Sequence, residues 1–310
     1  MRNTIFIALI SMLAFPATAN AQDCRPAFSD GDQSLSLNGD SIEPGGRATE
    51  NFTVRILNEA RTETRQDDRR GFPGQRCEAR LRIARIGALP GPDFPPYSLR
   101  TPRNRQIEVL PDAASGGTTD SDVPIANVPA GPEGRAVPVR LSVPTEWGLR
   151  AGTYTEQLEL LLIDDAGNIA DRSSLTLTII IPPASSLRLV GAVVGSGDSG
   201  PAQIDLGNLS STTETRSNPF AARIFSTAPY SVEFSSANMG SLLHEQGSEQ
   251  IPYRLFFDGT EVDLAGTYEI AFPEHTSQAG DRRAMRIVVP PVVALAGSYS
   301  DRITMTVTAM

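Results

Sequence analysis

The chain has 310 residues, of which 40% are hydrophobic and 20% are charged, so it is long enough for two domains that each bury an apolar core. Its basic residues are all arginine, and it has only two cysteines and two histidines. This composition excludes lysine Schiff-base chemistry, a P-loop and a multi-cysteine zinc site. The formal charge of -9 makes nucleic acid an unfavourable partner. We therefore expect a protein that binds or builds, with no catalytic site, cofactor or metal.

The first residues resemble an export signal. Arg2 gives a positive start, residues 5–15 are apolar, and small side chains follow at Ala19 and Ala21. The apolar run is too short to span a bilayer. We therefore expect residues 1–21 to be a signal peptide that is removed after Ala21; a buried N-terminal helix is the alternative.

The two cysteines are expected to pair in an oxidising compartment. Cys24 and Cys77 are the only cysteines of the chain, and exported proteins keep such pairs oxidised. The chain-entropy model gives the closure of such a loop roughly 4 kcal/mol of stability. A catalytic thiol is the alternative, but neither cysteine has a histidine nearby in the sequence.

Apolar and polar residues alternate with a period of two along the remaining chain, which is typical of half-buried antiparallel strands. Strands are expected first around residues 52–56, 79–83, 107–109, 137–143, 157–162 and 174–181. After Pro182 and Pro183 the pattern resumes at residues 187–189, 230–234, 253–255, 286–288 and 302–307. The fold class is therefore all-β, with two immunoglobulin-like β-sandwich domains over residues 22–181 and 187–310 and a linker at 182–186.

A short motif occurs once in each half. Residues 151–156 read Ala-Gly-Thr-Tyr-Thr-Glu, and residues 296–301 read Ala-Gly-Ser-Tyr-Ser-Asp, each leading into an expected strand. Tyr154 and Tyr299 are expected to act as tyrosine corners, with the ring buried and the hydroxyl bonded to the incoming backbone. Coincidence between two turn-strand junctions is the alternative.

The segments after the two copies of the motif differ. In the first half, the turn at residues 164–168 leads into one further strand at residues 174–181, whereas the second half ends at Met310 within the strand itself. We expect the second sandwich to lack its last strand and to expose an apolar groove that another chain fills. Alternatively, an earlier segment such as residues 187–194 fills the gap.

The second half resembles the spore coat protein U domain of archaic chaperone-usher pilus subunits. The segments that carry the resemblance are residues 204–209, 228–232, 238–240, 251–255 and 296–301. The first half shares the tyrosine corner, and its cysteine pair looks like the disulfide of such domains. The second half departs from the pattern because it has no cysteine.

The resemblance implies an incomplete sandwich whose missing strand is lent first by a periplasmic chaperone and then, at the outer-membrane usher, by the N-terminal donor strand of the adjacent pilus subunit. It also implies transport to the periplasm and display on the cell surface as part of a fimbrium. The side chains expected to line the groove are Ile303, Met305 and Val307, which alternate with polar residues. An ordinary core role in a complete sheet is the alternative for these three.

A chain that begins at Gln22 has no free segment to donate before Cys24. We therefore expect an accepting subunit at the pilus tip, with residues 22–181 as the adhesive domain for biofilm formation or attachment, and with an abiotic surface or host receptor as its target. Loops are the expected contact region. The candidate surface-binding residues are Phe72, Leu89, Phe94 and Tyr97. Packing of these loops on their own domain is the alternative.

A second hypothesis is a self-contained periplasmic or secreted β-sandwich that binds a ligand such as a carbohydrate. A hydrolase is disfavoured because no Ser-His-Asp grouping is legible. Residues 164–168 have the composition of a calcium loop but the spacing of a hairpin turn. His244 and His275 have no neighbours at metal-binding spacing.

Overall fold

The computed structural model describes residues 24–39, 46–59, 77–87, 90–101, 122–129, 131–195, 201–247 and 249–310. The expected signal peptide, Phe72 and Leu89 lie outside these residues. The described chain consists of strands and connections, so the expectation of an all-β protein is confirmed. No helix in the described ranges is long and apolar enough to cross a membrane.

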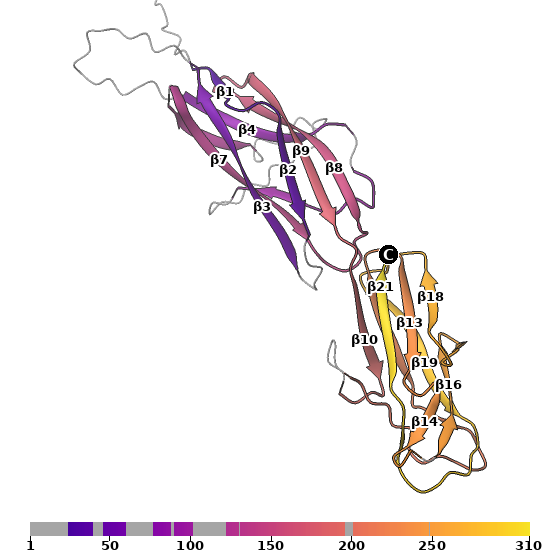
Figure 1. Cartoon of the computed structure of the whole chain (residues 1–310). Helices are drawn as coiled ribbons and strands as arrows, with labels where there is room; N and C mark the ends of the chain where they lie inside the picture. Colours follow the sequence, from indigo (N-terminus) through magenta and orange to yellow (C-terminus); the bar gives the residue numbers. More distant parts are fainter. Residues whose placement is uncertain are drawn as a thin grey trace, which may run out of the picture.

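The molecule is elongated, with two β-sandwiches arranged end to end and Met310 close to the junction between them (Figure 1). Each sandwich has its own hydrophobic core, one formed by residues between Leu35 and Ile181 and the other by residues between Phe220 and Val289. The two cores agree with the number of domains expected from the sequence. The boundaries at residues 181 and 187 stay predictions.

The N-terminal sandwich consists of a four-stranded and a five-stranded sheet. The first sheet has the order β1 (Pro26–Phe28), β3 (Arg47–Asn58), β7 (Gly131–Pro144) and β5 (Ser98–Arg100). The second has the order β2 (Gln33–Asn38), β9 (Ile169–Ile181), β8 (Gly152–Ile163), β4 (Cys77–Arg85) and β6 (Val123–Val128). The alternating apolar side chains point between these sheets, where Leu81, Leu141 and Leu158 are fully buried.

The C-terminal sandwich is built around aromatic side chains. One sheet has the order β10 (Ser185–Gly191), β12 (Phe220–Ser226), β19 (Asp281–Val289), β16 (Arg254–Phe257) and β17 (Thr260–Val262), and β11 (Thr215–Arg216) also pairs with β19. The facing sheet has the order β18 (Tyr268–Phe272), β13 (Tyr230–Ser236) and β21 (Ile303–Ala309). A small sheet joins β15 (Gln250–Pro252), β14 (Ser241–His244) and β20 (Tyr299–Ser300). Tyr230, Phe234 and Phe257 fill the interior.

Thr227 connects the two sandwiches. This residue is fully buried in the loop between β12 and β13. Its carbonyl accepts the Ala151 N–H at 2.6 Å, and its hydroxyl donates to the Pro182 carbonyl at 2.9 Å. The Ala184 N–H donates to the same hydroxyl at 2.9 Å. These hydrogen bonds hold a loop of the first sandwich and the linker against the second sandwich.

The expected disulfide is present between Cys24 and Cys77, whose Cα atoms are 5.2 Å apart. It joins the residues just before β1 to the first residue of β4, and so links the two sheets of the N-terminal sandwich. Cys77 is 1% exposed and Cys24 is half-buried, so the bond packs against the first core.

We predict that replacing both Cys24 and Cys77 by serine destabilises the N-terminal sandwich alone. Loss of a bridge across a loop of this length costs about 2–5 kcal/mol. Thermal unfolding should show an earlier first transition with the second transition unchanged. Reductant should shift the wild-type protein in the same way and leave the variant unaffected; equal shifts of both transitions would contradict the prediction.

Candidate functional site

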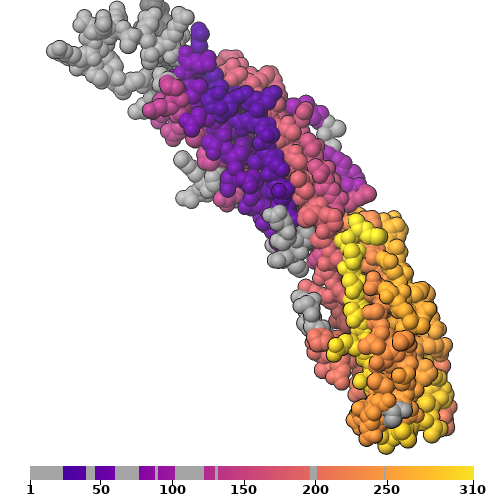
Figure 2. Space-filling view, in the orientation of Figure 1, coloured from indigo at the N-terminus to yellow at the C-terminus, as the bar shows by residue number. Residues whose placement is uncertain are grey.

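β21 is an edge strand with one free side. It pairs antiparallel with β13 through its whole length, from Ile303 opposite Ser236 to Ala309 opposite Tyr230. Among the residues that the structure describes, no strand is hydrogen-bonded to its other side. The space-filling view shows β21, in yellow, at the surface along the side of the second sandwich (Figure 2). An edge of this kind is a template for pairing with another strand.

In the N-terminal sandwich, the position that corresponds to the free side of β21 is occupied by a strand. Its strand β8 includes the first copy of the repeated motif from Gly152 onward and pairs with β4. β21 begins just after the second copy and pairs with β13. Leu160 lies opposite Ile83 in the first pair, and Met305 lies opposite Phe234 in the second. On its other side, β8 is paired with β9 through twelve positions between Gly152 and Ile163. The second sandwich has no counterpart of β9 among the described strands.

Burial changes with the presence of this neighbouring strand. Leu158, Leu160 and Leu162 of β8 are all 0% exposed. The residues at the same distance after the second motif are half-buried, namely Ile303, Met305 and Val307. These are the three residues expected to line a groove. The structure brings them together on the inner face of β21, where they pack against the second core while keeping one side accessible.

The main-chain groups of the same residues face the open side. The Arg302 C=O and the Met310 N–H are hydrogen-bonded on the β13 side, at 2.9 and 2.7 Å. Main-chain bonds alternate in direction along an antiparallel strand. The residues that direct their N–H and C=O away from β13 are therefore Ile303, Met305 and Val307. Apolar side chains and main-chain groups that β13 does not pair thus coincide on one edge.

β10 forms the other wall of this open edge. Its apolar residues Leu187 and Leu189 are half-buried against the second core. The Ser185 hydroxyl donates to the Val307 carbonyl at 3.1 Å, so the two walls are adjacent near the junction. The alternative in which residues 187–194 complete the sheet of β21 is wrong, because β10 pairs with β12 in the opposite sheet.

Both tyrosines of the repeated motif are bonded in the same way. The Tyr154 hydroxyl donates to the Arg150 carbonyl at 2.7 Å, and the Tyr299 hydroxyl donates to the Leu295 carbonyl at 3.3 Å. Each acceptor lies four residues before its tyrosine. The single proton of the Tyr299 hydroxyl is shared between the Leu295 carbonyl and the Glu249 carboxylate, and the hydrogen bond to Glu249 lowers the pKa of that carboxyl. The loop that leads into β21 is therefore held at its start.

The acidic residue that ends the motif has a partner that sequence reasoning missed. The Tyr97 hydroxyl donates to Glu156 at 2.5 Å, and the Tyr253 hydroxyl donates to Asp301 at 2.6 Å. Burial, together with the bond to the carboxylate, raises the pKa of both tyrosines. Asp301 also accepts the Ser236 hydroxyl at 2.6 Å. In the sequence, only the repetition of an acidic residue at the end of the motif indicated a role for Glu156 and Asp301. Their tyrosine partners could not be identified, because they lie far away in the chain.

The candidate surface-binding residues that can be described are packed on their own domain. The Phe94 ring lies 6.0 Å from the Tyr97 ring and 5.6 Å from the Tyr154 ring, measured between centroids. Both Phe94 and Tyr97 are half-buried against the first core. Tyr154 lies three residues after Ala151, whose N–H is bonded to Thr227 of the second sandwich, so this loop is near the junction. Phe94 and Tyr97 therefore pack on their own domain, which agrees with the alternative to surface binding.

At the other end of the N-terminal sandwich, β3 ends at Asn58, which pairs with Pro26 of β1, and β4 begins at Cys77. β1 lies at the end remote from the second sandwich (Figure 1). Phe72 and Leu89 themselves lie outside the described residues.

In the described part of the chain, no group of three or more His, Cys, Asp or Glu side chains is placed to hold a metal ion. Residues 164–168 form a hairpin turn in which the Asp164 carboxylate accepts the Asn168 N–H at 2.7 Å. His244 is buried, with its Nδ1 accepting the Gln246 N–H at 3.1 Å and its Nε2 3.3 Å from the Ala296 carbonyl.

Neither a protein-family model nor a curated protein sequence matches this chain. The solved structures similar to it include the complex of a chaperone with the tip adhesion subunit of archaic chaperone-usher Csu pili from Acinetobacter baumannii. That likeness has 13% identity, covers 91% of this chain and 99% of the other, and has a TM-score of 0.45. The spore coat U resemblance is therefore not supported by a family match.

Two other similar structures are also described as adhesins. The CupB6 tip adhesin of Pseudomonas aeruginosa is 10% identical, with coverage of 91% and 94% and a TM-score of 0.38. A CfaE adhesin variant from enterotoxigenic Escherichia coli is 10% identical, with coverage of 91% and 99% and a TM-score of 0.31. At such identities and TM-scores, function has to be inferred from the geometry of this chain.

We predict that Asp301→Asn destabilises the C-terminal sandwich by about 1–3 kcal/mol. One carboxylate oxygen accepts two hydroxyls and the other accepts the Asn238 N–H at 3.0 Å. An amide has only one acceptor oxygen, so at least one of these donors loses its partner. The measurement is the second transition in thermal unfolding. Glu156→Gln is the matched control and should lower the first transition only.

Proposed function

We propose that this chain is a non-enzymatic tip subunit of a chaperone-usher surface pilus, completed by a β-strand from another chain. The observation that carries the proposal is the edge of β21, where half-buried apolar side chains and outward main-chain groups coincide. Pairing at such an edge supplies both main-chain hydrogen bonds and pockets for alternate side chains. A periplasmic chaperone, the usher and the donor strand of an adjacent subunit are the partners of this proposal.

β9 serves as a template for the added strand. It runs antiparallel to β8 and parallel to β2, and places an aliphatic side chain in the core at every second residue. These residues are Leu175, Leu177, Ile179 and Ile181. A strand beside β21 therefore needs aliphatic residues at alternate positions and no inward charge. The similar solved complex described as a chaperone with a tip adhesion subunit is compatible with this partner class.

The adhesive surface is proposed to lie at the end of the N-terminal sandwich remote from the junction. Strand addition at β21 engages the C-terminal sandwich, and the Phe94 loop is packed near the junction. The remote end is the one that extends farthest from the assembled fibre. The proposed role is adhesion to an abiotic surface or a host receptor, with biofilm formation as a consequence.

We predict that the β9 sequence, residues 169–181, stabilises the C-terminal sandwich when it is fused after Met310 through a flexible linker. The added strand buries Ile303, Met305 and Val307 and pairs their backbone groups. The second unfolding transition should rise by about 10 °C or more, and the protein should become monomeric. Thermal unfolding and light scattering are the measurements.

The matched control for this fusion carries serine in place of Leu175, Leu177 and Ile179 in the added copy only, and should give no gain. Met305→Arg in the fused protein should abolish the gain, because it places a charge in the groove. If the chain without any added strand is monomeric, unfolds cooperatively in both sandwiches and gains nothing from the fusion, the proposed completion is wrong.

We further predict that Phe72→Ala in the strand-completed protein reduces its retention on a hydrophobic surface about fivefold, as expected for loss of one aromatic anchor. The measurement is the fraction of protein retained on polystyrene after washing. Phe94→Ala is the matched control: it should lower the first unfolding transition and leave retention of the folded protein unchanged. Retention that depends on Phe94 and not on Phe72 would place the adhesive surface elsewhere.

A further inference from the structure

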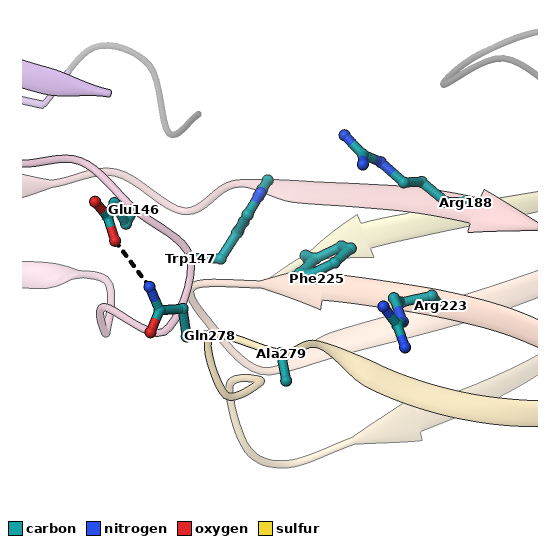
Figure 3. Close-up of a pocket in the computed structure, with 7 residues that line it drawn as sticks. All are labelled: Glu146, Trp147, Arg188, Arg223, Phe225, Gln278 and Ala279. Carbon is teal, nitrogen blue, oxygen red and sulfur yellow. Dashed lines mark hydrogen bonds between the residues drawn. The ribbon is translucent and has the colours of Figure 1, made fainter. Parts of the chain in front are cut away.

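A cavity of about 300 Å³ lies where the two sandwiches meet, a volume at the lower end of the usual range for ligand sites. Most of its lining residues belong to the second sandwich, and the others belong to the loop between β7 and β8 of the first (Figure 3). The charged, aromatic and amide side chains of this lining are Glu146, Trp147, Arg188, Arg223, Phe225 and Gln278. None of them belongs to the open edge at β21.

Two aromatic rings form an apolar surface in the cavity. Trp147 comes from the first sandwich and Phe225 from the end of β12, and their ring centroids are 5.5 Å apart with an interplanar angle of 33°. Both side chains are half-buried, so part of each ring remains accessible. The Arg188 guanidinium lies 6.0 Å from the Phe225 centroid. The cavity thus combines exposed ring faces with a cation.

Arg188 begins a row of arginines across three strands. It lies opposite Arg223 of β12, and Arg223 lies opposite Arg282 of β19. Like charges placed directly opposite each other destabilise a sheet. Among the described residues, neither Arg223 nor Arg282 forms an ion pair with an acidic side chain. In a chain of formal charge -9, this row is a local concentration of positive charge.

The other side of the cavity is polar and contains an acid. The Gln278 side-chain amide donates to the Glu146 carboxylate at 2.8 Å, and the two side chains lie across the aromatic rings from the arginines (Figure 3). A carboxylate here disfavours ligands that are anionic throughout, such as nucleic acid or an anionic membrane. It favours a ligand with an acidic group at one end and hydroxyl groups at the other.

We propose that this cavity binds an acidic saccharide. The carboxylate or sulfate of the sugar contacts Arg188 and Arg223, whose guanidinium groups suit bidentate hydrogen bonding to two oxygens of one oxyanion. The apolar face of the sugar ring packs on Trp147 and Phe225, and its hydroxyl groups bond to Gln278 and Glu146. The proposal goes beyond the pilus role and does not require strand addition, because it uses the outer face of the sheet and not its open edge.

Trp147 is the only tryptophan of the chain, so intrinsic tryptophan fluorescence reports on this cavity alone. We would titrate the full chain with a galacturonate trimer, a sulfated heparin disaccharide and neutral chitotriose, and follow the emission. The expected result is a saturable change with one or both acidic saccharides and none with chitotriose. The trimer and the disaccharide distinguish a carboxylate from a sulfate as the recognised group.

Arg188→Gln and Arg223→Gln should each weaken the acidic saccharide about tenfold or more, since each removes a charge-assisted contact. Arg286→Gln is the matched control: it lies on the same strand as Arg282, over the Phe256 ring at 4.9 Å, and should bind like the wild type. Unchanged unfolding transitions in all three variants exclude a folding defect as the cause.

The proposal is overturned if no acidic saccharide changes the emission, or if both cavity variants bind as tightly as the Arg286 variant. It is also overturned if sodium sulfate at equal concentration gives the same response as the saccharides. Binding of a single-stranded oligonucleotide or of phosphatidylserine vesicles in the absence of saccharide binding would assign the arginine row to a different partner class. None of these results decides whether strand addition occurs, which the fusion tests separately.

Discussion

The organisation of the C-terminal sandwich depends on the hydrogen-bonding requirement of a single strand edge. Main-chain N–H and C=O groups are obligatory hydrogen-bonding groups, and in a sheet interior a neighbouring strand satisfies them. Water can form these hydrogen bonds at an exposed edge. Contact with water is unfavourable, however, for the apolar side chains of Ile303, Met305 and Val307 on the same edge. Only another strand meets both requirements together. This distinguishes the edge of β21 from an ordinary polar edge, which is commonly protected by charge or proline.

The second sandwich keeps β21 in place without the neighbour that β8 has. Seven residues of β21 pair with β13, and the start of the strand is held by Asp301, which accepts hydrogen bonds from Ser236 and Tyr253. The aromatic core provides the remaining stability, with the Phe234 and Phe257 ring centroids 5.1 Å apart. The N-terminal sandwich has a further strand and a disulfide in addition to the same corner. Among the described strands, the edge of β21 is therefore held on one side and open on the other.

Much of this architecture is readable from the sequence because it depends on local patterns. The alternation in residues 137–143 predicts β7, and the repeated motif predicts the equivalence of β8 and β21, including the groove residues. The hydrogen bond from Tyr97 to Glu156 joins residues 59 apart in the chain and follows no periodic pattern. The apolar and aromatic side chains of the Phe94 loop are compatible both with an adhesive surface and with packing on the domain itself. The sequence does not distinguish the two, because the outcome depends on where the loop lies relative to β4 and β8. The junction cavity takes Trp147, Arg188, Phe225 and Gln278 from four separate segments, so no motif marks it.

β10 connects the open edge of β21 and the junction cavity. Leu187 and Leu189 line the open edge, whereas Arg188 between them lines the junction cavity, because successive side chains of a strand point to opposite faces. Among the described strands, β10 is paired with β12 alone, and a strand paired on one side is held less firmly than an interior one. A strand docked between β10 and β21 would bury the two leucines and restrict β10, and with it the Arg188 backbone. If the docked strand favours the arrangement of Arg188 that binds a ligand in the cavity, it raises the affinity of the cavity for that ligand. By thermodynamic linkage, a ligand in the cavity then raises the affinity of the edge for the strand by the same factor. Because Leu187 and Leu189 face the edge and Arg188 faces the cavity, β10 provides a physical route by which strand docking at the edge can influence ligand binding in the cavity.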